Sequence, residues 1–363
     1  MKDTSKTSGG LLPDDCAPQH ERAPRPLPLF LELVRRVALS DPKVARDALV
    51  GLRAYADAVR RPEAEPRPEV GRVRGAALRD HGGEGPVAVL VPSLINPPLI
   101  LDLDPEVSLA RAIRGMGRRV LLLDWGKASE RAELDVAGHV EVLLLPLLEA
   151  IGEPAALIGY CLGGTMAIAA AGLAPCEQVV TLAAPWHFDR YPERSRAALA
   201  DIWRSSKAAA ETLGALPMEV LQGAFWSLDP ERTVAKFAQF GRADPTSAKA
   251  RRFVALEDWA NAGEPLPCRA AAELLEDMFG RDLPGHGEWR VGDRLVRERP
   301  AVPAAHLLAG HDVIAPAATA PAGEIRTIPA GHVGMIVGSQ RSLLHAELAR
   351  VLGPPLAAPR PAR

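Results

Sequence analysis

The chain has 363 residues, of which 47% are hydrophobic and 24% are charged, as in an ordinary globular protein. Lys and Arg total 43 against 45 Asp and Glu, and the net charge of −2 gives no electrostatic reason to expect nucleic-acid binding. No apolar run has the length of a transmembrane segment, and the N-terminus carries acidic residues where a signal peptide needs an apolar core. We therefore expect a cytoplasmic protein with reduced cysteines.

The N-terminal part divides into two predicted segments. Residues 1–28 are rich in Pro, Lys, Asp and Ser, which predicts a disordered leader, and residues 29–84 read as a helical segment followed by a linker. The apolar spacing predicts two helices, the second capped by Ser40 or Asp41. The first helix carries an apolar stripe: Leu29, Phe30, Leu33 and Val34. We expect the stripe to dock on the main domain, with contact to a partner or to a hydrophobic surface outside the chain as the alternative.

From about residue 85, short apolar runs alternate with helical stretches, which predicts a mostly parallel α/β sheet. The runs are Val87–Val91, Arg119–Asp124, Ala156–Tyr160, Gln178–Ala184, Val302–Gly310 and Glu324–Ile328. Residues 186–300 interrupt this alternation and read as mainly helical. The sequence thus predicts an α/β core of residues 85–185 and 301–353, a helical cap insertion at 186–300, and a disordered tail at 354–363.

A nucleophile elbow is the strongest local signal. Gly159-Tyr160-Cys161-Leu162-Gly163-Gly164 follows an apolar run and opens a helical one, as the G-x-nucleophile-x-G turn of the α/β-hydrolase fold does. Gly159 and Gly163 would let the strained turn close. Cys161 would then lie at the N-terminus of a helix, where the dipole and the backbone N–H of Leu162 stabilise a thiolate and a developing oxyanion.

A thiol nucleophile needs a base, and the base needs a carboxylate that orients it. In this fold both follow late strands, with the acid before the base. Asp312 directly follows one such strand, and His332 follows the last one. His311 competes for the role of base because it neighbours the acid. However, this fold places the base in a loop after a late strand, and no such loop is left for His311.

The remaining site expectations concern the oxyanion loop and the other cysteines. The second oxyanion donor should be the backbone N–H of Leu94 or Ile95, in the loop after the first core strand. Asn96 reads equally as a site residue or as a turn residue before two prolines. No metal-ligand cluster, phosphate loop or dinucleotide fingerprint occurs, so we expect no metal and no cofactor. The other cysteines are expected to be inert: Cys16, Cys176 and Cys268.

These segments resemble the polyhydroxyalkanoate synthases, in particular the short ones. The resemblance runs from about Val87 to Leu352 and rests on the elbow, on AGHDVIAP and AGHVGMIVG, and on three longer motifs: Val91–Ile113, Val120–Gly126 and Phe253–Pro267. It implies an acyl-Cys161 intermediate with His332 as base, a 3-hydroxyacyl-CoA substrate and a growing polyester chain. It also implies residence at cytoplasmic granules, while a homodimer or a second synthase subunit stays open.

Two other functions use the same residues differently. A hydrolase with this triad would act as a thioesterase or as a depolymerase of the stored polyester, releasing free acid. A non-catalytic granule-associated protein would instead rely on the amphipathic N-terminal helices. The choice of Cys favours transfer, because thiolate attack on an acyl-CoA exchanges one thioester for another of similar energy.

Overall fold

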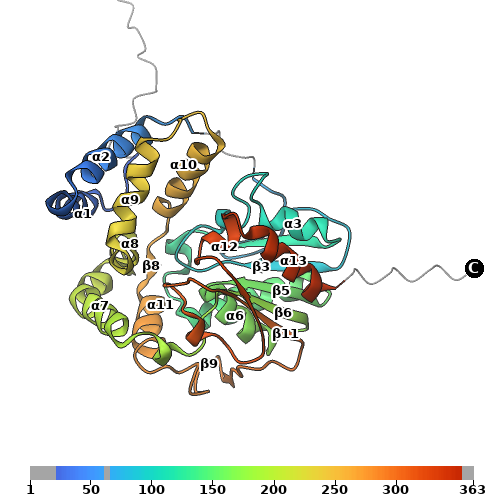
Figure 1. The fold of residues 1–363 in the computed structure, drawn as a ribbon. Coiled ribbons are helices and arrows are strands. Elements are labelled where there is room, and N and C mark those ends of the chain that lie inside the picture. Colours follow the sequence, from blue (N-terminus) through green and yellow to red (C-terminus); the bar gives the residue numbers. More distant parts are fainter. Residues whose placement is uncertain (1–21, 61–65, 354–363) are drawn as a thin grey trace, which may run out of the picture. The chain divides into compact units, whose positions relative to one another are not determined.

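The computed structural model describes residues 22–60 and 66–353, and these residues form two compact units (Figure 1). The first unit holds described residues up to 60 together with 230–254, and the second holds 66–229 and 255–353. Most of the predicted leader and the whole predicted tail lie outside the described residues. None of the described helices combines the length and apolar character that crossing a membrane requires.

The first unit is a group of helices joined from distant parts of the chain. It consists of α1 (Leu27–Ser40), α2 (Pro42–Asp57), α9 (Pro230–Gly241) and the start of α10 (Ala248–Asn261). The side chain of Asp41, not that of Ser40, caps α2 by accepting the N–H groups of Lys43 and Val44 at 3.1 and 3.0 Å. Gly51 and Gly241 meet where α2 crosses α9, and a Cβ on Gly51 would lie 1.9 Å from a carbonyl oxygen of α9.

The predicted docking of α1 on the main domain is wrong. Phe30, Leu33 and Val34 are buried, but Phe30 packs against Phe237 of α9, with ring centroids 4.7 Å apart. Tyr55 of α2 meets the same ring edge-on at 5.9 Å. The apolar stripe is therefore covered by part of the insertion, a partner that is distant in sequence and that helical periodicity cannot identify.

The second unit is built on one eight-stranded sheet, in which only β2 runs antiparallel to its neighbours. In spatial order the strands are β1 (Glu69–Val73), β2 (Ala76–Asp80), β4 (Arg119–Asp124), β3 (Val87–Val91), β5 (Ala155–Tyr160), β6 (Cys176–Leu182), β11 (Ala304–Ala309) and β12 (Glu324–Ile328). β5, β6, β11 and β12 are neighbours, so their carboxyl ends share one edge. In open parallel sheets this edge is where ligands bind.

Helices cover both faces of the sheet (Figure 1). Alternate residues of β3 enter two separate cores, Val87 and Val89 on one face and Ala88 and Leu90 on the other. The first face packs against α4 (Val136–Gly138), η4 (His139–Leu144), α5 (Leu145–Ile151) and α6 (Leu162–Ala171). The second packs against α3 (Leu109–Gly115), α12 (Gly334–Val337) and α13 (Arg341–Leu352).

The insertion is mainly helical, with two small two-stranded antiparallel sheets. Its elements in the second unit are η5 (Phe188–Arg190), α7 (Glu193–Leu213), β7 (Ala215–Leu216), α8 (Met218–Leu228), the end of α10, β8 (Leu266–Pro267), α11 (Cys268–Ala272), η6 (Glu273–Met278), β9 (Arg290–Val291) and β10 (Arg294–Leu295). Short helical turns lie in the loops of the core: η2 (Pro98–Leu101), η3 (Ala128–Arg131) and η7 (Ala317–Thr319).

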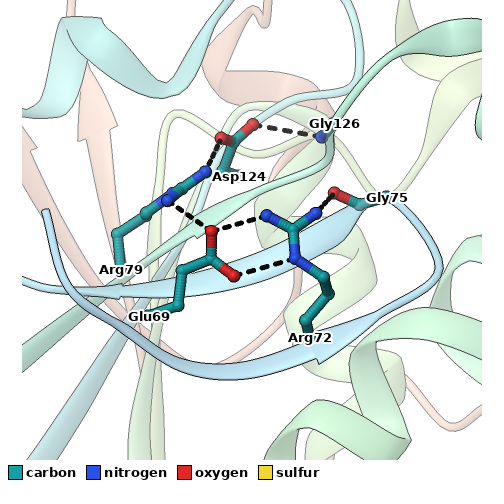
Figure 2. A network of polar contacts seen from close by, with 6 residues as sticks. All are labelled: Glu69, Arg72, Gly75, Arg79, Asp124 and Gly126. Atoms are coloured by element: carbon teal, nitrogen blue, oxygen red, sulfur yellow. Dashed lines mark hydrogen bonds and ion pairs between the residues drawn. The ribbon is translucent and has the colours of Figure 1, made fainter. Parts of the chain in front are cut away.

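The sheet begins earlier than the sequence predicts, because residues 69–80 of the expected linker form β1 and β2. Figure 2 shows how the charges of this hairpin are paired: Glu69 accepts from Arg72 and Arg79, and Arg79 reaches Asp124 at the end of β4 at 3.4 Å. β1 is an edge strand and largely exposed. Charged residues are typical of edge strands, where they prevent pairing with other chains. Because linkers are also rich in charged residues, the sequence did not distinguish the two.

Candidate active site

Cys161 lies between the buried strand β5 and helix α6, in a backbone conformation that residues other than glycine rarely adopt. Its φ is 57° and its ψ is −132°. Such strain persists only where the surroundings enforce it. Here a Cβ on Gly159 would lie 2.4 Å from the carbonyl oxygen of Gly163, and one on Gly163 would lie 2.2 Å from the carbonyl oxygen of Val91. These two positions therefore admit glycine alone, which is the steric reason for the predicted elbow.

Asp312 and His332 form a buried pair at the same edge of the sheet. Asp312 follows β11 and His332 follows β12, and Nδ1 of His332 donates to Oδ2 of Asp312 at 2.7 Å. Oδ1 of Asp312 accepts the backbone N–H groups of Ile314 and Ala315 at 2.8 and 2.9 Å. Three donors thus hold this carboxylate in one orientation, and the imidazole keeps Nε2 for another partner.

That partner is Cys161, whose side chain is close enough to the imidazole to raise the pKa of His332. Burial lowers the pKa of His332, but the charge of a Cys161 thiolate and the hydrogen bond to Asp312 outweigh burial and raise the pKa from 6.5 to about 10. The charged form of His332 is therefore favoured when Cys161 carries a negative charge. The three side chains predicted from the sequence are brought together in the order nucleophile, base, acid.

The competing histidines and cysteines lie elsewhere. His311 is exposed, and only its backbone N–H is held, by the carbonyl of Ala330. His306 is buried in β11 against Thr181 at 2.9 Å, where burial lowers its pKa to about 4. Burial likewise raises the pKa of the Cys176 thiol to about 11. Such a thiol is a poor nucleophile at neutral pH.

The two candidates for the second oxyanion donor differ in their hydrogen bonds. The N–H of Ile95 donates to Oγ of Ser93 at 3.4 Å, whereas none of the hydrogen bonds among the described residues uses the N–H of Leu94. The loop that carries both is close to the elbow, because Gly163 contacts the carbonyls of Val91 and Pro92. Of the two, Leu94 is thus the better candidate.

Two tyrosines near the site were not singled out from the sequence. Tyr160 precedes the nucleophile, and its hydroxyl donates to the carbonyl of His332 at 3.3 Å, with its ring 5.0 Å from the imidazole. Tyr191, from the start of the insertion, is also buried. Burial first, then the charges at Cys161 and Asp312, raise the pKa of both hydroxyls well above 10, so both stay protonated. Only the position of Tyr160 in the elbow could have indicated a role.

One group of side chains among the described residues could hold a metal ion. The ligand atoms of Asp189, Asp282 and His286 lie within 4.8 Å of one another. However, Oδ1 of the buried Asp282 already accepts the backbone N–H groups of Phe188 and Gly285, at 2.8 and 3.1 Å. A structural role in fixing this turn accounts for Asp282.

Comparison with known proteins gives relatives of one kind. The chain is 28% identical over 274 residues to the poly(3-hydroxyalkanoate) polymerase subunit PhaC of Haloferax mediterranei, covering 69% of this chain and 55% of that protein. It is also 28% identical over 294 residues to PhaC of Haloarcula marismortui, covering 76% and 61% of the two proteins. The chain is therefore similar in sequence to poly(3-hydroxyalkanoate) polymerase subunits. PhaC of Synechocystis is 26% identical over 281 residues, with 70% and 74% covered.

Two further results define how far the similarity reaches. The alignments span little more than half the length of the first two PhaC relatives, and no family model matches the chain. The structure of a Bacillus megaterium epoxide hydrolase in complex with an inhibitor superposes with a TM-score of 0.50 at 12% identity, covering 77% of this chain and 99% of that one. With the sheet order, this confirms the α/β-hydrolase fold.

Proposed function

We propose that the chain is a polyhydroxyalkanoate synthase that transfers 3-hydroxyacyl groups from CoA to a growing polyester through an acyl-Cys161 intermediate. The observation that carries the proposal is the Cys161–His332–Asp312 arrangement on a strained elbow, in a homologue of PhaC polymerase subunits. CoA enters as part of the substrate, and we propose no further cofactor and no metal.

The first step is thioester exchange. The Cys161 thiolate attacks the acyl carbon, a new C–S bond forms, and the carbonyl electrons move to oxygen. The N–H groups of Leu162, at the N-terminus of α6, and of Leu94 are the donors we propose for that oxyanion. When the intermediate collapses, the C–S bond to CoA breaks, and the leaving thiolate takes the proton from His332 Nε2.

The second step needs His332 as a neutral base, and acylation of Cys161 converts the imidazolium into this neutral form. Once Cys161 is a thioester it carries no charge, so the largest of the effects that raise the pKa of His332 is lost, while burial continues to lower that pKa. Neutral Nε2 can then accept the proton of a 3-hydroxyl group as its oxygen attacks acyl-Cys161. An ester forms, and the thiolate and the imidazolium are restored together.

The chain would act at granules in the cytoplasm, in a homodimer or with a second synthase subunit. The relatives are named as subunits, which supports an assembly. Sedimentation of the pure protein with and without substrate would measure whether it self-associates.

The test follows CoA release from 3-hydroxybutyryl-CoA and separates polymer from free acid. We expect polymer from the wild type, none from Cys161→Ala, and unchanged synthesis from Cys176→Ala, a matched control at a cysteine outside the site. Free hydroxy acid alone would show a thioesterase, and acid released from added polyester would show a depolymerase. CoA release that persists in Cys161→Ala would refute the nucleophile. If CoA is not released and an acyl-CoA analogue does not label Cys161, the result would favour a non-catalytic, granule-associated binding protein.

A further inference from the structure

Indole N–H groups hold both ends of the oxyanion loop, defined here as Pro92–Pro97. Trp125, just after β4, donates from Nε1 to the carbonyl of Pro92 at 3.1 Å. Trp259, near the end of α10, donates from Nε1 to the carbonyl of Pro97 at 2.9 Å. One indole belongs to the core and the other to the insertion.

The sequence of the loop makes these bonds important. Pro97 and Pro98 have no N–H, so their carbonyls are the only backbone groups through which this end can be fixed. Inside the loop the only hydrogen bond is the long one from Ile95 to Ser93, at 3.4 Å, among the bonds of the described residues. A loop with so few internal bonds depends on its neighbours for its conformation.

The residues after Trp259 make further contacts with the same region. A Cβ on Gly263 would lie 3.0 Å from the carbonyl oxygen of Ile95 and 2.9 Å from Cγ of Met218, so the two segments pack backbone against backbone. Oε2 of Glu264 accepts the N–H of Ala128, in the loop after β4, at 3.1 Å. We call Trp259–Glu264 the strap, because it contacts the loops that follow two core strands.

On its other side the oxyanion loop touches the elbow. The carbonyls of Val91 and Pro92 lie against Gly163, the second residue of α6, with no room for a Cβ. Any displacement of the loop therefore changes its distance from the helix N-terminus that supplies the Leu162 N–H. An oxyanion held by one fixed and one displaced donor loses much of its stabilisation.

We propose that Trp259 is a positioning residue, through which the insertion fixes the Leu94 N–H for oxyanion stabilisation at Cys161. The inference rests on the proposed acyl-Cys161 intermediate, but it concerns any acyl donor. It makes acylation of Cys161 dependent on an insertion residue that has no part in the Cys161–His332–Asp312 hydrogen bonds.

The test compares two reactions of the same thiol in Trp259→Phe, which keeps the ring but removes the N–H. Acylation by p-nitrophenyl butyrate passes through an oxyanion, whereas alkylation by iodoacetamide does not. We expect the single-turnover acylation rate to fall about 10- to 100-fold. The alkylation rate should stay within about twofold of wild type, and the loss should be in the rate constant and not in KM.

Trp203→Phe is the matched control, because it removes an indole N–H from the insertion that binds Glu276 at 2.5 Å, away from the loop. Acylation at the wild-type rate in Trp259→Phe, or an equal loss in Trp203→Phe, would overturn the inference. Equal losses of acylation and alkylation in Trp259→Phe would also overturn it, as would a wild type that is acylated by neither ester nor acyl-CoA. A Trp259-dependent acylation without polymer from 3-hydroxybutyryl-CoA would refute only the proposed function.

Discussion

The Asp312→Asn variant separates the electrostatic role of the acid from its structural role. The asparagine carbonyl can still accept the N–H groups of Ile314 and Ala315, so the turn should remain folded. Its amide group would face Nδ1 of His332, which must then accept a hydrogen bond. Nε2 would carry the proton toward Cys161 and could not take the proton of the thiol.

The size of the effect follows from the state of His332. Raising the pKa of His332 from 6.5 to about 10 corresponds to about 5 kcal/mol in favour of the charged form, supplied by Cys161 and Asp312 against the cost of burial. Losing roughly half of this would slow acylation about 100-fold. The wrong tautomer adds to the loss, since the same change in a Ser–His–Asp triad lowers kcat about 10⁴-fold. We therefore expect a loss between about 10² and 10⁴.

The assay is stopped-flow CoA release at pH 7, together with the pH profile of Cys161 alkylation. Because the pKa of His332 is raised, its charged form and the stability it contributes are fully present below about pH 6.5 and are lost as the pH rises through about 10. Without the carboxylate this alkaline limit should move to lower pH. His311→Ala, an exposed neighbour of Asp312, is the control and should leave both measurements unchanged. A loss of less than tenfold in Asp312→Asn, with an unmoved alkaline limit, would refute the reasoning.

Two further predictions concern packing. Gly163→Ala would place its Cβ 2.2 Å from the carbonyl oxygen of Val91, so we expect loss of acylation and about 1–3 kcal/mol of destabilisation in a urea titration. The control is Gly172→Ala at the other end of α6, whose Cβ meets nothing closer than 3.5 Å and which should be neutral. Phe30→Ala removes a fully buried ring from the first unit and should cost about 3–5 kcal/mol of local stability, measured by hydrogen exchange, whereas Leu31→Ala, 42% exposed, should cost under about 1 kcal/mol. Wild-type protection of the first unit in Phe30→Ala would contradict the packing described.

The parts of the site that the sequence predicted depend on local rules. Cys161 was recognisable because a strand, a strained turn and a helix must follow one another with glycines at fixed spacing. Asp312 and His332 were recognisable because parallel strands place their carboxyl ends at one edge, whatever their distance along the chain. Each inference needed only a strand and the residue that follows it.

The parts that were missed depend on contacts between distant segments. The burial of Phe30 requires knowing that α1 and α9, about 200 residues apart, pack together. β1 was missed because its charged residues suggest a solvent-exposed linker when only composition is considered. In the structure Glu69 is paired with Arg72 of the same strand and with Arg79 of β2. The choice between Leu94 and Ile95 depended on a single hydrogen bond to Ser93, and no periodicity encodes such a bond.

The division of the site between core and insertion has a consequence for its chemistry. Cys161, His332 and Asp312 all follow strands of one rigid sheet, so their mutual distances are set by the core. Tyr191 and Trp259 come from the insertion. The charge of Asp312 contributes to the raised pKa of the Tyr191 hydroxyl, and Trp259 donates to the oxyanion loop. Substitutions in the core should therefore abolish reaction at Cys161. Those in the insertion should leave a reactive thiol that is acylated slowly, so the two classes are distinguished by the ratio of acylation to alkylation and not by activity alone.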